Sequence, residues 1–419
     1  MAVRALAALG AAPYQAGLIA ALHPTEITIA RRCVDVPDLL ATAAARQADV
    51  ALVDASLPGL DADVVSRVVD EGVPVVALAE PSAAGAAQRL LAMGASAVVE
   101  PAEVERLVAI ALGLLASSDR RSAGLPETAD AAGESAPADP AVATGSLIAV
   151  WGPGGAPGRS TVALNLAAEL AARGRETLLV DADVYGGSIA QMLGMLDESS
   201  GLLAATRQAN AGTLDAEALS GHCREVEPRL RVLTGLPRAD RWVEAKSALV
   251  RTVLATARRV VATTVVDLGF SLEVDEDVTY DTTAPRRNGA TLEVLERADL
   301  VVVVGSADPV GLARLIRACV ELPDSVAGVA PLVAVNRLRP ELGWSRDEIA
   351  DLLSRAAGLD EAHWLPFDLA ACDRALVRGA SLRQVAEQSK LSRAFQALAA
   401  EVDRSPRPRV TTRTAATVP

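Results

Sequence analysis

Aromatic side chains and lysines are both scarce in this chain. Phe, Tyr and Trp make up 2% of the 419 residues, so a core must be built mainly from Ala, Val and Leu. Lys246 and Lys390 are the only lysines, and arginine supplies the rest of the positive charge. The net charge of −13 argues against a broad basic surface for nucleic acid, although a local arginine patch is compatible with it.

Cysteines, histidines and long apolar runs are also few. The four cysteines lie far apart with no C-x-x-C spacing, and the three histidines add no metal-binding pattern. We therefore expect reduced thiols in a cytoplasmic protein rather than disulfides or a zinc site. No run approaches the ~20 consecutive apolar residues of a transmembrane helix. Hydrophobic residues still make up 51%, enough for sizeable cores in two or three domains.

Strand and helix patterns alternate at short intervals through residues 3–116. Five apolar segments predict strands: Val3–Leu9, Glu26–Ala30, Val50–Val53, Val73–Leu78 and Ala95–Val99. Helical patterns fill the intervals and end with Val104–Leu115. Five β/α units predict a flavodoxin-like, doubly wound α/β domain over residues 1–116.

A glycine-rich turn follows the predicted strand Leu147–Val150. The turn contains Gly152, Gly154, Gly155 and Gly158, and an amphipathic helix begins at Ser160 and Thr161. Backbone N–H groups at such a turn form an anion site, which usually holds the polyphosphate of a nucleotide. The pattern G-x-x-x-x-G-K-[ST] is met imperfectly, because Arg159 stands where that pattern has lysine.

Carboxylates end two further predicted strands. Asp181 and Asp183 follow the strand Thr177–Val180, and Asp267 follows the strand Val260–Val266. The carboxyl ends of parallel strands are where open α/β sheets bind ligands. One such carboxylate can hold Mg²⁺ through water, and another can orient an attacking water.

The ordered motifs GRST, DAD and DLG resemble the MinD/ParA family of ATPases, which has a deviant phosphate loop. The sequence VNR, which contains Asn336, and the sequence LPFD, which ends at Asp368, extend the resemblance over about residues 146–402. It implies a mostly parallel-sheet P-loop NTPase domain over residues 147–403, ATP and Mg²⁺ as cofactors, and a homodimer.

The resemblance also implies roles for individual residues. Ser160, Asp181 and Asp267 would hold Mg²⁺, Asp183 would orient the attacking water, and Arg159 would contact the phosphates. The remaining nucleotide contacts would come from Gly154, Gly155, Ala156, Gly158, Thr161, Asn336 and Asp368. For each polar residue a structural use as a cap or turn stays open.

Two departures from the family make fast ATP hydrolysis doubtful. Arg159 keeps the charge of the family's lysine but is larger and planar. The family's signature lysine, which reaches the γ-phosphate of a dimer partner, is replaced by Pro153, and Pro157 lengthens the loop by one residue.

The first domain resembles a response-regulator receiver that has lost its site. Asp54 lies in a VDASLPG turn like a phospho-acceptor, and LAMGASAVVEP resembles the approach to a receiver's last strand. Gly10, Ala11 and Ala12 stand where receivers have a metal-binding acidic pair, and Glu100 stands where they have lysine. A degenerate receiver ahead of a MinD-like ATPase resembles the CpaE/TadZ proteins, which localise pilus assembly.

Two segments lack apolar periodicity. Residues 117–146 are rich in Ala, Ser, Gly, Pro and acids and predict a flexible linker. Residues 404–419 predict a disordered tail without the basic amphipathic helix of membrane-binding relatives. The apolar face of Leu382–Val402 predicts one helix docked on the sheet, and the acidic segment Ser271–Asn288 predicts a surface loop.

Three functions remain open from the sequence. The first is an ATP-binding positional regulator with weak or no hydrolysis that localises a pilus, secretion, septum or segregation machine. Its partners would recruit it to the inner membrane or the pole. The second is a nucleotide-independent scaffold built from two degenerate domains. The third is a response regulator phosphorylated at Asp54.

Overall fold

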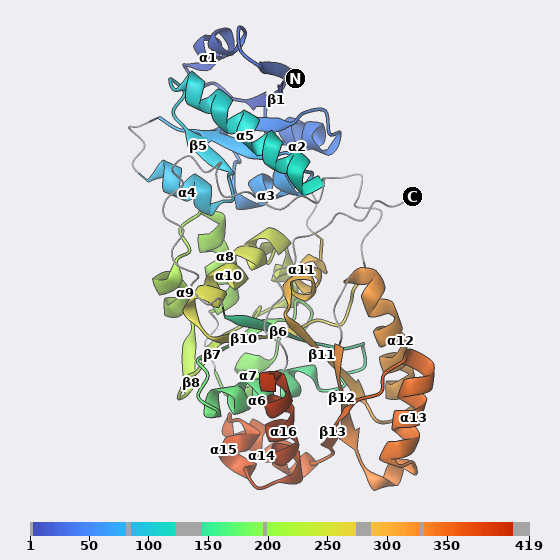
Figure 1. Ribbon diagram of the computed structural model, residues 1–419. Coiled ribbons are helices and arrows are strands. Elements are labelled where there is room, and N and C mark those ends of the chain that lie inside the picture. The colour runs from blue at the N-terminus through green and yellow to red at the C-terminus, as the bar shows by residue number, and fades with distance from the viewer. Residues whose placement is uncertain are drawn as a thin grey trace.

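The structure is a computed structural model that describes residues 3–80, 85–122, 145–195, 199–273, 286–326 and 331–404. Two parallel-stranded sheets follow one another along the chain, and helices cover both faces of each (Figure 1). The predicted strands at residues 3–9, 50–53, 147–150 and 177–180 all form with bounds within two residues of those expected.

The first sheet has five strands in the order β2-β1-β3-β4-β5, all parallel, which is the order of flavodoxin-like doubly wound folds. Helices α1 and α5 pack on one face and α2, α3 and α4 on the other. Its elements are β1 Val3–Ala8, α1 Gln15–Leu22, β2 Ile27–Arg32, α2 Val36–Ala44, β3 Val50–Asp54, α3 Ala62–Asp70, β4 Val75–Leu78, α4 Ala86–Ala92, β5 Ala97–Val99 and α5 Val104–Ser122.

The second sheet has eight strands in the order β13-β12-β11-β6-β10-β7-β9-β8, and only β8 runs antiparallel to its neighbour. Its strands are β6 Ser146–Trp151, β7 Thr177–Ala182, β8 Arg224–Glu227, β9 Leu230–Leu233, β10 Thr263–Leu268, β11 Leu300–Ser306, β12 Pro331–Leu338 and β13 His363–Pro366. The central strands are continuous apolar runs because both faces of the sheet are covered.

Helices form one layer on each side of this second sheet. Helices α6, α15 and α16 pack on one face, whereas α8, α10, α11 and α12 pack on the other. The helices are α6 Arg159–Ala172, α7 Ile189–Met192, α8 Gly201–Asn210, α9 Ala216–His222, α10 Ser247–Val260, α11 Gly289–Arg297, α12 Pro309–Ser325, α13 Arg346–Ala357, α14 Leu369–Arg378, α15 Leu382–Ala386 and α16 Lys390–Arg404. Within the described residues, short 3₁₀ helices form at Ala239–Glu244 and Pro340–Leu342.

Some predicted bounds are wrong. The single helix expected over Leu382–Val402 is two helices, α15 and α16, because the chain turns where the Ser392 hydroxyl bonds the Ala386 carbonyl. Helix α5 runs to Ser122, past the predicted start of the linker at residue 117. The antiparallel strand β8 was not predicted, because its sequence REVE has no apolar run.

Parts of three predicted segments lie outside the described residues. They are residues 123–144 of the linker, 274–285 of the acidic segment and 405–419 of the tail. The domain bounds therefore stay a prediction. Within the described residues, no helix is both long enough and apolar enough to cross a bilayer.

The first domain contacts the second through helix α3, which packs against α8 and α10 (Figure 1). Ala62 of α3 is buried in the same apolar cluster as the α10 side chains Leu249 and Val253. Lys246 donates to the Asp63 carboxylate at 3.0 Å, and Arg251 pairs with Asp70 at 3.1 Å. The first domain therefore rests on the helical layer opposite α6.

Candidate functional site

The loop between β6 and α6 presents a row of unpaired backbone donors. Its backbone takes left-handed conformations at Gly155 (φ 105°), Ala156 (φ 52°) and Gly158 (φ 100°). Among the described residues, no protein acceptor meets the backbone N–H groups of Gly154, Gly155, Ala156, Gly158, Arg159, Ser160 and Thr161. A loop of this kind at the start of a helix is an anion cradle.

Two glycines of the loop combine a positive φ with close side-chain neighbours. Gly158 precedes α6, and a Cβ there would lie 2.4 Å from Nδ2 of Asn336. A Cβ on Gly155 would lie 2.1 Å from Nη1 of Arg314. Both positions have positive φ, which favours glycine, and at Gly155 the close atom is the end of an exposed side chain, which can move.

Asp181 and Asp267 lie side by side at the end of the sheet. They are register partners on the adjacent parallel strands β7 and β10, and Val150 of β6 is the partner of Asp267 on the other side. Both aspartates are almost fully buried, at 1% and 0% exposure. The predicted meeting of these carboxylates beside the glycine-rich loop is therefore present.

Asp267 is a carboxylate without a normal hydrogen bond. Both of its oxygens are buried and have no partner of acceptable geometry among the described residues. Burial, and then the charge of Asp181, raise the pKa of Asp267 well above its usual range, whereas the nearby Ser160 hydroxyl lowers it. A divalent cation at this point would compensate the buried oxygens, so Ser160 and Asp267 fit Mg²⁺.

Asp181 is held by backbone donors instead. Its oxygens accept from the N–H groups of Asp183 at 3.3 Å and Ile189 at 3.1 Å. Burial raises the pKa of Asp181 to about 7, and the charge of Asp183 adds to that rise. With these donors in place, Asp181 lies next to Asp267 with both of its oxygens already accepting hydrogen bonds.

Arg159, the first residue of α6, is bonded to the loop that precedes it. Its Nε donates to the Leu268 carbonyl at 2.9 Å, and its Nη1 donates to the carbonyls of Gly152 and Pro153 at 3.2 and 3.1 Å. Its Nη2 lies 3.6 Å from Oδ2 of Asp183. The guanidinium therefore lies at the predicted edge of the sheet, next to Asp183, but most of its donors already have acceptors.

Asp183 also has other partners. Its Oδ1 accepts from the N–H groups of Tyr185 at 2.9 Å and Gly186 at 3.3 Å. Tyr185 packs against Phe270 with ring centroids 4.9 Å apart and planes tilted by 38°, so two aromatic rings lie next to the Asp183 turn. These two rings were not predicted from the sequence, because single aromatic residues in loops carry no local signal.

Asn336 and Asp368 both have structural contacts. Nδ2 of Asn336 donates to the Pro157 carbonyl at 2.8 Å, and its Oδ1 accepts from the Arg337 N–H at 2.8 Å. Asp368 is the N-cap of α14, where it accepts from the Ala371 N–H at 3.0 Å. Asn336 thus touches the loop directly, whereas Asp368 caps a helix beyond β13.

The sequence also gave no reason to select Arg314 of α12. Its Nη1 donates to the Gly154 carbonyl at 3.3 Å. An exposed arginine on an amphipathic helix looks like many others in this chain, so only the packing of α12 against the loop reveals it.

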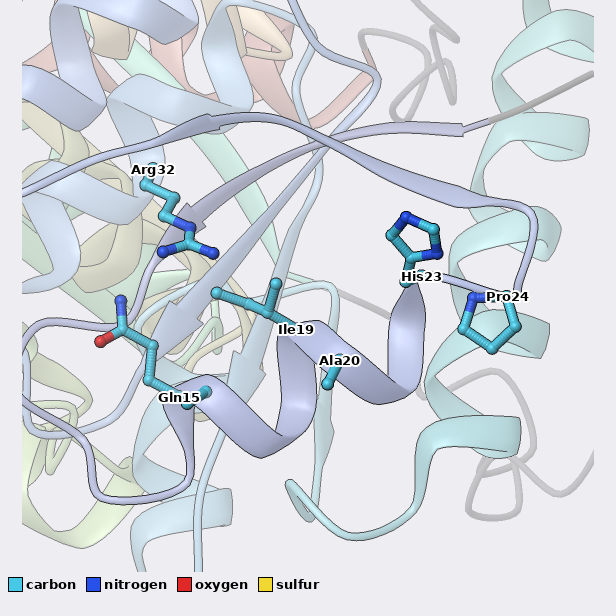
Figure 2. A pocket seen from close by; sticks show the side chains of 7 residues that line it. Gln15, Ile19, Ala20, His23, Pro24 and Arg32 are labelled. Atoms are coloured by element: carbon cyan, nitrogen blue, oxygen red, sulfur yellow. The ribbon is translucent and has the colours of Figure 1, made fainter.

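A larger hollow of about 530 Å³ lies on the first domain (Figure 2). It is lined by side chains of α1, of the turn between α1 and β2 and of the end of β2, among them Gln15, Ile19, Ala20, His23, Pro24 and Arg32. His23 and Arg32 are exposed, and no described carboxylate lines the hollow. The unpaired backbone N–H groups and buried carboxylates lie at the β6–α6 loop of the second domain and not at this hollow.

Among the described residues, no group of three or more His, Cys, Asp or Glu side chains could hold a metal ion. A cation beside Ser160 and Asp267 would therefore need phosphate oxygens and water to complete its ligands. The four cysteines are free, and burial raises the pKa of the Cys319 thiol to about 12.

Comparisons with known proteins agree with this geometry. Residues 144–212 match the ParA family model described as NUBPL iron-transfer P-loop NTPase. No curated protein sequence matches the chain.

Solved structures share the fold of the second domain. The cell division ATPase MinD of Pyrococcus furiosus is 20% identical, covers 62% of this chain and 99% of its own, and has a TM-score of 0.50. A ParA family ATPase of Chlorobium tepidum is 20% identical, covers 61% and 98%, and has a TM-score of 0.51. The septum site-determining protein MinD of Pyrococcus horikoshii, complexed with Mg-ADP, is 18% identical, covers 62% and 96%, and has a TM-score of 0.48. The chain thus carries a ParA-family P-loop segment within a domain that has the MinD/ParA fold.

Proposed function

We propose that this protein binds ATP with Mg²⁺ at the β6–α6 loop and acts as a positional regulator. The observation that carries the proposal is the row of seven unpaired backbone N–H groups beside an unpartnered buried carboxylate, Asp267. A polyphosphate with its cation would satisfy both at once.

Each site residue has a part in this proposal. The loop N–H groups of Gly154 to Thr161 bind the phosphates, and the Ser160 hydroxyl and Asp267 hold Mg²⁺ with Asp181 beside Asp267. Asp183 orients the attacking water, and Asn336 and Asp368 lie on the adenine side. Bound Mg²⁺ would supply charge stabilisation for phosphoryl transfer.

Hydrolysis is slow or absent in this proposal. Arg159 already donates to three carbonyls and faces Asp183, so it must leave these partners to reach a phosphate. Pro153 brings no charge to the loop. We expect phosphate release well below the ~1–10³ s⁻¹ of typical enzymes.

The cellular role in this proposal is to localise a machine. The flavodoxin-like order of the first sheet and the lost receiver residues support a degenerate receiver ahead of the ATPase, as in CpaE/TadZ proteins. A homodimer would bind proteins of a pilus, secretion, septum or segregation apparatus and be recruited by them to the inner membrane or pole.

Titration with a fluorescent ATP analogue tests the binding step. We expect a saturable, Mg²⁺-dependent signal for the wild type and at least about tenfold weaker binding for Asp267→Asn, because a charge-assisted contact to the cation is lost. The exposed Asp347 of α13 gives a matched control, and Asp347→Asn should bind like the wild type. No saturable signal up to about 1 mM, a very weak affinity for a nucleotide, would remove the proposal.

A nucleotide-independent scaffold is the second candidate. It is favoured by the bonds of Arg159 and Asn336, which hold the loop in shape through protein contacts alone. If partner proteins copurify unchanged with both Arg159→Ala and Asp267→Ala variants, the scaffold function replaces the ATP-dependent one.

A further inference from the structure

Helix α12 places an arginine on the first half of the phosphate-type loop. Nη1 of Arg314 donates to the Gly154 carbonyl at 3.3 Å, and a Cβ on Gly155 would lie 2.1 Å from the same nitrogen. Gly154 and Gly155 directly follow Pro153 in the chain. The Arg314 guanidinium therefore lies where the loop itself brings no charge.

A small cavity of about 50 Å³ separates this part of the loop from the start of α12. Its walls are loop residues 153–155 and 157 on one side, and residues 306, 308, 310, 311 and 314 on the other. It has room for a few water molecules rather than for a phosphate chain. A phosphate could enter only if Arg314 released the Gly154 carbonyl.

The two charged side chains at this cavity, Asp308 and Arg314, differ in how many hydrogen-bond partners they have. The Asp308 carboxylate accepts from the Gly311 N–H at 2.9 Å and from the Ser306 hydroxyl, which together lower the pKa of Asp308. Arg314 is exposed and forms no salt bridge with any carboxylate of the described residues. Arg159, by contrast, faces Asp183 and donates to three carbonyls. Of these two arginines, Arg314 is the one free to bind an incoming anion.

We propose that Arg314 contacts the terminal phosphate of a nucleoside triphosphate bound on the loop. This inference rests on the proposed nucleotide binding. Inner phosphates would lie at the start of α6, near Ser160 and Thr161, so the outermost group lies toward Gly154 and Gly155. The guanidinium exchanges one neutral carbonyl for phosphate oxygens, which it can bind with two parallel N–H groups.

Affinities for ATP and ADP analogues, measured with Mg²⁺ on the full chain, test the assignment. Arg314→Ala should weaken ATP binding by about tenfold or more and ADP binding by less than about threefold, because one charge-assisted contact to the outer phosphate is lost. Arg314→Lys should retain part of the preference for ATP. Arg317, exposed about one turn further along α12, gives the matched control, and Arg317→Ala should bind like the wild type.

Three results would overturn the assignment. Equal ATP affinity of the wild type and Arg314→Ala, with wild-type binding intact, would show that Arg314 makes no phosphate contact. An equal loss for ATP and ADP would move the contact to an inner phosphate. Absence of binding in the wild type itself would remove the proposed function as well. Superimposable circular dichroism of the variants would show that the exposed substitution leaves the fold intact.

Discussion

Arg159 carries more structural bonds than its place in a phosphate loop requires. Its bonds tie together the end of β6, the end of β10 and the Asp183 loop. From the sequence we expected the Arg159 guanidinium to contact phosphate. The structure shows that this guanidinium already donates to three backbone carbonyls. A planar fork of donors can serve several carbonyls at once, which a lysine cannot do.

We therefore predict that Arg159→Ala lowers the free energy of unfolding, in addition to removing any contact between Arg159 and a phosphate. Leaving three carbonyls without their donor should cost about 1–3 kcal/mol of unfolding free energy. Urea unfolding followed by tryptophan fluorescence measures this, since Trp151 lies at the end of β6. Arg317→Ala should leave the midpoint unchanged, and an equally unchanged midpoint for Arg159→Ala would refute the prediction.

Asp54 offers a second prediction for a single residue. The Tyr14 hydroxyl donates to its Oδ2 and the Ser56 hydroxyl to its Oδ1. Burial, and then the hydrogen bond to Asp54, raise the pKa of Tyr14, so the phenol stays a donor. Both oxygens of a residue that would accept phosphate are thus already bonded.

We expect Asp54 to stay unmodified when the protein is incubated with acetyl phosphate and Mg²⁺. Borohydride trapping and mass spectrometry of the Asp54 peptide measure this. Tyr14→Phe frees Oδ2 but restores no acidic pair, since Gly10, Ala11 and Ala12 remain, so this variant should also stay unmodified. A trapped Asp54 adduct in the wild type would instead support the response-regulator function.

At the scale of elements, one buried side chain links α6 to the C-terminal helices. Oδ1 of Asn165 accepts from the Leu382 N–H at the start of α15, and Nδ2 donates to the Thr161 carbonyl, both at 2.8 Å. Asn165 is 4% exposed. The sequence predicted α6 from its apolar spacing, but an asparagine inside a helix gave no sign of its distant partner.

Asn165→Ala should therefore destabilise the second domain by about 1–3 kcal/mol, because it leaves the buried Leu382 N–H without an acceptor. Chemical unfolding measures the loss, and hydrogen exchange at Leu382 should become faster. Asn210 is a matched control, because its Oδ1 has no partner among the described residues. If Asn165→Ala proves no more destabilising than Asn210→Ala, this link between α6 and α15 does not contribute to stability.

At the scale of the whole molecule, Arg251 of α10 forms hydrogen bonds and ion pairs that connect the two domains. It bonds Ser66 and Asp70 on α3 and Glu293 on α11, and the Glu293 hydrogen bond raises the pKa of Arg251. Helix α11 follows the Asp267 strand along the chain. The contact between the two domains also includes Gly212, just after α8, which lies close to the Arg89 carbonyl of α4.

We predict that the double variant Asp63→Asn/Asp70→Asn releases the first domain from α10. The ion pairs of Asp63 with Lys246 and of Asp70 with Arg251 are both weakened, and contacts between domains of one chain commonly permit relative motion. Small-angle scattering should then give a larger radius of gyration than for the wild type. Glu105→Gln, which neutralises a carboxylate on the exposed start of α5, should have no such effect. An unchanged radius in the double variant would show that apolar contacts alone hold the domains.

The sequence by itself determined the apolar strands, the glycine-rich loop and the carboxylates at the strand ends. These follow from local patterns: apolar runs form strands, and Asp181 and Asp267 meet because parallel neighbours end at the same edge. Tertiary structure decided which partners these residues have. The bond from Arg159 to Leu268 and the place of Arg314 beside Gly154 join residues 109 and 160 positions apart, and the orphaned oxygens of Asp267 depend on the same tertiary packing, about which a local pattern carries no information.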